Sequence, residues 1–199
     1  GTAVQSIGVF LHGTTITSDK GNVAFYGDST VQAKAGGDAA NHTEGIRFGG
    51  TNPVNINSGT GTILMDGIAR GTTGCGIGIE FDNSGGASHS ITAAATAGNA
   101  IALTGDASSE SAGANSTTGL WLHGDTALTA TGSGGISLTG VGGAHATYNE
   151  AIWAADGASA INAGTGALTV LGRGTVNLSS SAITAGTASM TAENVAQTT

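Results

Sequence analysis

The sequence has 199 residues, of which 36 are glycine and only 9% are charged. Aromatic residues make up 4% and proline occurs once, which excludes a core of large rings and also proline-rich or collagen-like architectures. A formal net charge of −8 disfavours nucleic acid and anionic membranes as partners, and no apolar run approaches the roughly 20 residues of a membrane-spanning helix.

Short segments in which aliphatic and other residues alternate recur along the whole chain. Val9-Phe10-Leu11 and Ile136-Ser137-Leu138 are examples, and this period of two places one face of a β-strand inside. Because 39% of the residues are apolar and many follow this pattern, we expect a folded β-protein rather than a disordered chain. The single cysteine, Cys75, cannot form an internal disulfide.

Taken in chain order, these segments form six copies of one repeat, each with three short strands. The copies start near residues 7, 45, 78, 119, 151 and 175, and we expect residues 1–199 to form a single domain. The clearest copy spans Gly119–Gly140, and the sixth copy is the weakest. The expected inward pairs of the first three copies are Val9/Leu11, Ile16/Ser18, Val23/Phe25, Ile46/Phe48, Val54/Ile56, Ile63/Met65, Ile79/Phe81, Ile91/Ala93 and Ile101/Leu103.

The spacing of the copies is irregular. Most of the variation in length occurs in the segment between the third strand of one copy and the first strand of the next. The long segments there are Ser29–Glu44, Gly67–Gly76, Asp106–Thr118 and Gly140–Glu150, whereas Leu171–Thr175 is a bare connection. A solenoid keeps its sides in register but can extrude loops at a corner. The spacing therefore predicts about six three-sided turns, with the loops inserted at one corner.

If each copy is one turn of a parallel β-helix, equivalent residues stack about 4.8 Å apart. Two interior columns are then expected: Ile16, Val54, Ile91, Leu128, Ile161; and Val23, Ile63, Ile101, Ile136, Leu168. A glycine column follows the third strand, at Gly27, Gly67, Gly105, Gly140 and Gly172, where we expect corners with positive φ. A polar outward column on the second side contains Thr17, Asn55, Thr92, Thr129 and Asn162.

A further outward column, on the first strands, contains Phe10, Arg47, Glu80, Trp121 and Trp153. We expect an exposed ion pair between Arg47 and Glu80 and ring stacking between the two tryptophans. Exposed aromatic residues often mark contact sites, so Phe10, Trp121 and Trp153 are the candidate binding residues, for sugar rings or for a neighbouring molecule. The alternative is that the tryptophan rings cover the corner loops Asn115–Thr118 and Ala146–Glu150.

Catalysis by a polysaccharide hydrolase or lyase would need converging carboxylates with basic groups or a metal. Glu80 and Asp82 could share a face, but the basic residues are dispersed, at Lys20, Lys34, Arg47, Arg70 and Arg173. His12 and His123 occupy equivalent positions about 14 Å apart on this spacing, too far for shared metal ligation. The sequence therefore predicts no enzyme activity, no cofactor and no metal site.

Two stretches, GLWLHGDTALTATGSGGISLTGVGG and AIWAADGASAINAGTGALTVLGRG, resemble the repeats of giant secreted bacterial exoproteins of the filamentous-haemagglutinin type. The resemblance covers most of the chain. It implies a single-stranded right-handed β-helix located outside the cell or on its surface, with a structural or adhesive role. It says less about activity, because its motif is a pattern of glycines and alternating aliphatic residues.

The ends of the chain offer no amphipathic capping helix, and the N-terminus lacks a signal sequence, so we expect a processed or excised piece. Terminal turns with unpaired strand edges need a cover. Two expectations follow for partners: copies of the chain that stack end to end into a filament, or flanking turns of a longer chain. Host or matrix glycans are the alternative partner, and a polysaccharide-degrading enzyme is a more remote alternative.

Overall fold

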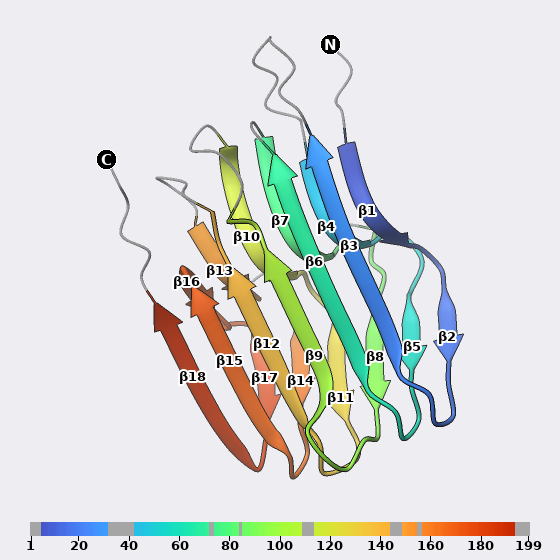
Figure 1. Ribbon diagram of the computed structural model, residues 1–199. Coiled ribbons are helices and arrows are strands. Elements are labelled where there is room, and N and C mark those ends of the chain that lie inside the picture. Colours follow the sequence, from blue (N-terminus) through green and yellow to red (C-terminus); the bar gives the residue numbers. More distant parts are fainter. Residues whose placement is uncertain are drawn as a thin grey trace.

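The computed structural model describes residues 5–31, 42–71, 74–83, 85–108, 114–143, 149–154 and 157–193. These residues form eighteen β-strands, and no helix occurs among them. Every strand pairing is parallel, and each strand pairs with the strands three places before and after it in the chain. The chain is thus a right-handed parallel β-helix of six turns, here called rungs, and each rung contributes one strand to each of three sheets (Figure 1).

The three sheets each contain six strands in the order of the rungs. The first sheet comprises β1 (Gln5–Leu11), β4 (His42–Phe48), β7 (Gly74–Phe81), β10 (Ala114–Leu122), β13 (Asn149–Trp153) and β16 (Thr175–Asn177). The second comprises β2 (Thr15–Thr17), β5 (Asn55–Asn57), β8 (Ser90–Ala93), β11 (Ala127–Ala130), β14 (Ser159–Asn162) and β17 (Ser181–Thr184). The third comprises β3 (Val23–Val31), β6 (Ile63–Gly71), β9 (Asn99–Asp106), β12 (Gly135–Val141), β15 (Ala167–Arg173) and β18 (Thr187–Glu193).

The core is a stack of apolar, mostly aliphatic columns, because each inward side chain lies over its equivalent in the next rung. On the third sheet the predicted column is confirmed, from Val23 through Ile63, Ile101 and Ile136 to Leu168. On the second sheet Ile56, not Val54, is the partner of Ile16 and Ile91. The prediction of Val54 was wrong by two residues because Val54 and Ile56 both point inward and are both buried, so alternation alone cannot choose between them.

The same shift changes the polar column on the outside of the second sheet. Asn57, rather than the predicted Asn55, pairs with Thr17 and Thr92. Asn55 instead pairs with Thr15 and Ser90. The remaining members, Thr129 and Asn162, are confirmed in register.

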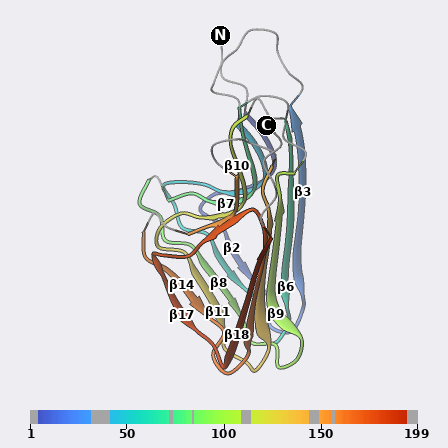
Figure 2. The same ribbon diagram turned by 90° about the vertical axis from the view of Figure 1, so that its left-hand side faces the viewer.

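The glycine column of the third sheet is confirmed in register, but its predicted positive φ is wrong. None of the five glycines appears among the residues with positive φ, which include Gly13, Gly59 and Gly164 in turns. The column instead faces the first sheet at van der Waals distance: a Cβ on Gly27 would collide with the carbonyl oxygen of Gly45, and one on Gly105 with that of Gly119. Glycine is needed there because two backbones touch. Figure 2 shows these two sheets running side by side.

Several segments predicted as corner loops are partly strand. β3 continues to Val31, β6 continues to Gly71 and β10 begins at Ala114, so the first and third sheets extend beyond the alternating triplets. The connection from the first to the second sheet also varies in length, from Leu11–Thr15 in the first rung to Phe81–Ser90 in the third.

Candidate functional site

The outer column of the first sheet consists of five residues, Phe10, Arg47, Glu80, Trp121 and Trp153. The strand pairings align these five residues as Cα partners, one in each successive rung, as predicted. Its residues alternate with core residues such as Ile46 and Phe48, so they point away from the interior. The column contains both the candidate aromatic residues and a cluster of charges.

A local irregularity brings a further carboxylate to this face. The pairing between β4 and β7 passes over Gly45 and Gly78 with no shift of register, and Glu44 lies on the side of β4 to which Arg47 projects, although the two residues are three apart. Arg47 Nη1 accordingly donates to Glu44 Oε1 at 3.1 Å and to Oε2 at 3.3 Å.

Arg47 lies at the centre of three carboxylates. Its Nη2 donates to Asp82 Oδ2 at 2.7 Å, and its Nε lies 3.4 Å from Glu80 Oε2 without hydrogen-bond geometry. Asp82 follows the end of β7 and lies on the same face as Glu80. The sequence interpretation held that these carboxylates lack a basic partner because the basic residues are dispersed. That was wrong for Arg47, which contacts Glu44, Glu80 and Asp82.

The charge cluster, meaning Glu44, Arg47, Glu80 and Asp82, is mostly removed from solvent. The side chain of Arg47 is 22% exposed, that of Glu44 is fully buried and those of Glu80 and Asp82 are 11% and 7% exposed. The predicted Arg47–Glu80 pair therefore exists, but within a buried network and not at the surface. Such burial makes each charge depend on its partners, because water no longer stabilises it.

The protonation of Glu80 reflects this environment. Burial, followed by repulsion from Glu44, raises the pKa of Glu80 to about 8, with Asp82 acting in the same direction and Arg47 opposing it. Burial disfavours the charged form of Arg47, yet Glu80, Asp82 and Glu44 together raise its pKa above the usual value. At neutral pH Glu80 is thus mainly a neutral acid, next to Glu44, Asp82 and the guanidinium of Arg47.

A neutral carboxylic acid can donate a proton, but this one is poorly placed to reach a substrate. Glu80 Oε2 and Arg47 Nε are closed to solvent, and Arg47 already occupies the space between the carboxylates. The arrangement suits a structural network that joins the second and third rungs. A general acid in an enzyme must lie within hydrogen-bond distance of its substrate, and the buried Glu80 oxygen does not offer that access.

The three aromatic residues of the outer column do not form one patch. Phe10 is 54% exposed and its ring lies against Gly49, whereas Trp121 and Trp153 are half-buried neighbours. The ring of Trp121 lies 5.4 Å from that of His123, and its Nε1 is buried without a hydrogen-bond partner. Arg47 and Glu80 separate Phe10 from Trp121 along the column.

Histidine and asparagine side chains link neighbouring rungs at the corner between the first and second sheets. His12 Nε2 lies 2.8 Å from Asn52 Nδ2, and His123 Nδ1 lies 2.7 Å from Asn83 Oδ1. Between them His89 is buried: its Nδ1 accepts from the Val54 amide at 3.2 Å, and its Nε2 donates to the Asp82 carbonyl at 3.0 Å. Among the described residues, no group of three or more His, Cys, Asp or Glu side chains could hold a metal ion.

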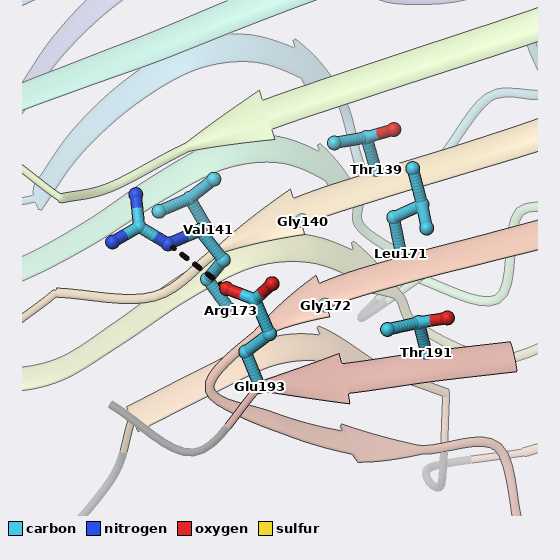
Figure 3. A pocket seen from close by; sticks show the side chains of 8 residues that line it. All are labelled: Thr139, Gly140, Val141, Leu171, Gly172, Arg173, Thr191 and Glu193. Atoms are coloured by element: carbon cyan, nitrogen blue, oxygen red, sulfur yellow. Dashed lines mark ion pairs between the residues drawn. The ribbon is translucent and has the colours of Figure 1, made fainter. Parts of the chain in front are cut away.

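A small pocket on the outer face of the third sheet was not anticipated from the sequence. Its volume is about 210 Å³, and Figure 3 shows its rows of side chains on β12, β15 and β18 on either side of Gly140 and Gly172. Arg173 Nε and Glu193 Oε2 form an exposed ion pair of 3.7 Å at its rim. The pocket is smaller than the roughly 300 Å³ at which small-molecule sites begin.

Comparison with protein-family models, with curated proteins and with solved structures finds no match for this chain. Among the residues that the structure describes, no helix is long and apolar enough to span a bilayer. Two further carboxylates, Asp125 and Asp156, are expected near equivalent turns. Asp125 lies in a turn with a φ of 42°, and Asp156 lies outside the described residues.

Proposed function

We propose that this chain is a structural and adhesive segment of an extracellular bacterial surface protein, a rigid section of a β-helical rod. One observation carries the proposal: a single core of stacked columns runs from rung to rung without interruption. Ile63, Ile101 and Ile136, in three successive rungs, are all buried. A solenoid of this kind is held together mainly by contacts between neighbouring rungs, which suits a rod.

The outer surface supports a structural role over a catalytic one. The carboxylates of Glu44 and Asp82 already form ion pairs with Arg47, and the pocket on the third sheet is small. The resemblance to filamentous-haemagglutinin-type repeats supports the extracellular location and the adhesive role.

An adhesion assay tests this function. Beads that carry the folded chain should bind to mammalian epithelial cells or extracellular matrix, and beads that carry the heat-unfolded chain should bind much less. A chain whose folded form binds no better than a bead coated with albumin is not adhesive, and the proposal would then have to be abandoned.

A glycan-binding module is the second candidate, because Trp121 and Trp153 are adjacent, half-exposed aromatic rings. In that case Trp121→Ala together with Trp153→Ala should abolish retention on a glycan array and leave the circular dichroism spectrum unchanged. Leu171→Ala, at an exposed position on another sheet, is the control and should bind as the wild type does. Equal retention by all three proteins would exclude this candidate.

A further inference from the structure

We propose that Trp121, His123 and Asn83 form a binding site for a neutral sugar ring. The inference rests on the glycan-binding candidate above, since it names the class of sugar and two polar residues that would hold it. The three side chains are half-buried, and they lie in the third and fourth rungs. Both rungs have a neighbour on each side, so the exposure of the site does not depend on where the chain begins or ends.

The backbone holds the two polar residues side by side at the corner that follows the first sheet. Asn83 comes two residues after the end of β7, and His123 comes directly after β10. The His123 amide donates to the Phe81 carbonyl at 3.1 Å, which continues the pairing of these strands into the corner. On the buried side, the imidazole of His89 donates to the Asp82 carbonyl at 3.0 Å. The corner is therefore ordered before a ligand binds, which lowers the entropy lost on binding.

The hydrogen bond between the two polar side chains decides what each can offer a ligand. His123 Nδ1 lies 2.7 Å from Asn83 Oδ1, and an amide oxygen can only accept, so Nδ1 carries the imidazole hydrogen. In the neutral ring Nε2 is then an acceptor, while Asn83 Nδ2 has two hydrogens to donate. The site thus presents an acceptor and a donor next to each other.

Trp121 supplies an apolar surface beside these polar atoms. Its ring lies 5.4 Å from that of His123 and is inclined to it by 44°, so the two rings are not stacked face to face. The indole Nε1 is buried, so the part of the side chain that reaches solvent is carbon. A sugar ring combines a face of C–H groups with hydroxyls that both donate and accept, and it therefore matches this site.

The charges around the site favour a neutral sugar over an acidic one. Asp125 is exposed two residues after His123. Asp82, which precedes the site asparagine, is already the partner of Arg47, 2.7 Å away. The whole chain carries a formal net charge of −8. A carboxylated or sulfated sugar would therefore meet like charges, which a neutral sugar avoids.

A second histidine, at the equivalent position of the first rung, provides a matched control. His12 also contacts an asparagine of the neighbouring rung, but there Nε2 lies 2.8 Å from Asn52 Nδ2. An amide nitrogen can only donate, so the acceptor of His12 is already used. His12→Ala therefore removes the same kind of residue without removing an acceptor that a sugar could reach.

Affinity gel electrophoresis tests the site, with galactomannan, xyloglucan or dextran as the neutral polysaccharide and polygalacturonate as the acidic one. At least one neutral gel should retard the wild type. His123→Ala should raise the dissociation constant about tenfold there, because a hydrogen bond and a ring contact are lost. His12→Ala should bind as the wild type does, and all variants should keep the circular dichroism spectrum.

Asn83 is expected to act partly by orienting His123, and a spectroscopic measurement tests that role. At pH 8, where imidazole is neutral, ¹⁵N NMR should place the hydrogen on Nδ1 in the wild type and on both nitrogens in turn in Asn83→Ala. An unchanged tautomer in Asn83→Ala would show that the proposed arrangement of donor and acceptor is wrong.

The inference is overturned if His123→Ala binds as tightly as the wild type, if His12→Ala is weakened equally, or if polygalacturonate retards the protein most. Loss of binding in the Trp121/Trp153 double variant but not in His123→Ala would refute this site and leave the glycan-binding candidate standing. A wild type that moves freely in all the neutral gels refutes the site as well. The adhesive role is tested separately by the bead assay.

Discussion

The inside of the coil and its outer column are held together in different ways. Inside, aliphatic side chains stack in columns and glycines let two sheets touch, so the fit is one of shape. Outside, Arg47 holds three carboxylates together in a mostly buried network, so the fit is one of charge. The contrast teaches that repetition is needed in the core, whereas two neighbouring rungs can carry an unrepeated arrangement on their outer face.

The largest effect is expected where shape is most demanding. Gly105→Ala should lower the free energy of unfolding by about 3 kcal/mol, because its Cβ would collide with the Gly119 carbonyl oxygen, and backbone cannot move aside cheaply. Gly172→Ala should cost less, since the atom nearest to its Cβ belongs to the side chain of Val176. Urea denaturation measures both, and equal losses would show that backbone contact does not set the requirement.

A somewhat smaller loss is expected when the charge network loses its cation. Arg47→Met should destabilise the protein by about 2–3 kcal/mol at pH 7, because buried carboxylates would lose their partner, although protonation relieves part of the cost. Arg70→Met breaks a pair in which both side chains are largely exposed and should cost about 0–1 kcal/mol. Similar losses in the two variants would mean that burial adds nothing to the network.

The effect that is smallest over any one pH unit is a dependence of stability on pH, which Glu80 causes. The pKa of Glu80 is about 8 in the folded protein and about 4.5 when unfolded, so the folded state holds the proton more tightly. The stability linked to this proton is fully present below about pH 4.5 and is lost as the pH rises toward 8, by at most about 1.4 kcal/mol per pH unit.

Glu80→Gln removes this dependence. The difference in unfolding free energy between the variant and the wild type should therefore shift in favour of the variant between pH 5 and pH 8, as measured by urea titrations at each pH. Glu193→Gln, at an exposed carboxylate, is the control. Parallel curves for wild type and Glu80→Gln would show that Glu80 does not bind the proton in this window.

Much of the fold could be predicted because the core repeats. The first-sheet and third-sheet columns aligned as the alternation indicated, and Trp121 and Trp153 are Cα partners in neighbouring strands. The second sheet failed at Val54 because its strands are short and two buried aliphatic residues fit one pattern. The charge cluster could not be predicted, since strict alternation does not place Glu44 on the same face as Arg47, three residues later, and the pairing is interrupted at Gly45 between them. A spacing of three between opposite charges in a strand that contains glycine was the only available signal.

The direction of the backbone hydrogen bonds has a mechanical consequence. They run along the axis of the coil from rung to rung, and each rung contacts mainly its two neighbours. A force that pulls on the two ends of the chain would therefore peel off one rung at a time. Each detached rung would release on the order of 100 Å of extended polypeptide. The solenoid would therefore lengthen in steps under load instead of breaking at one contact.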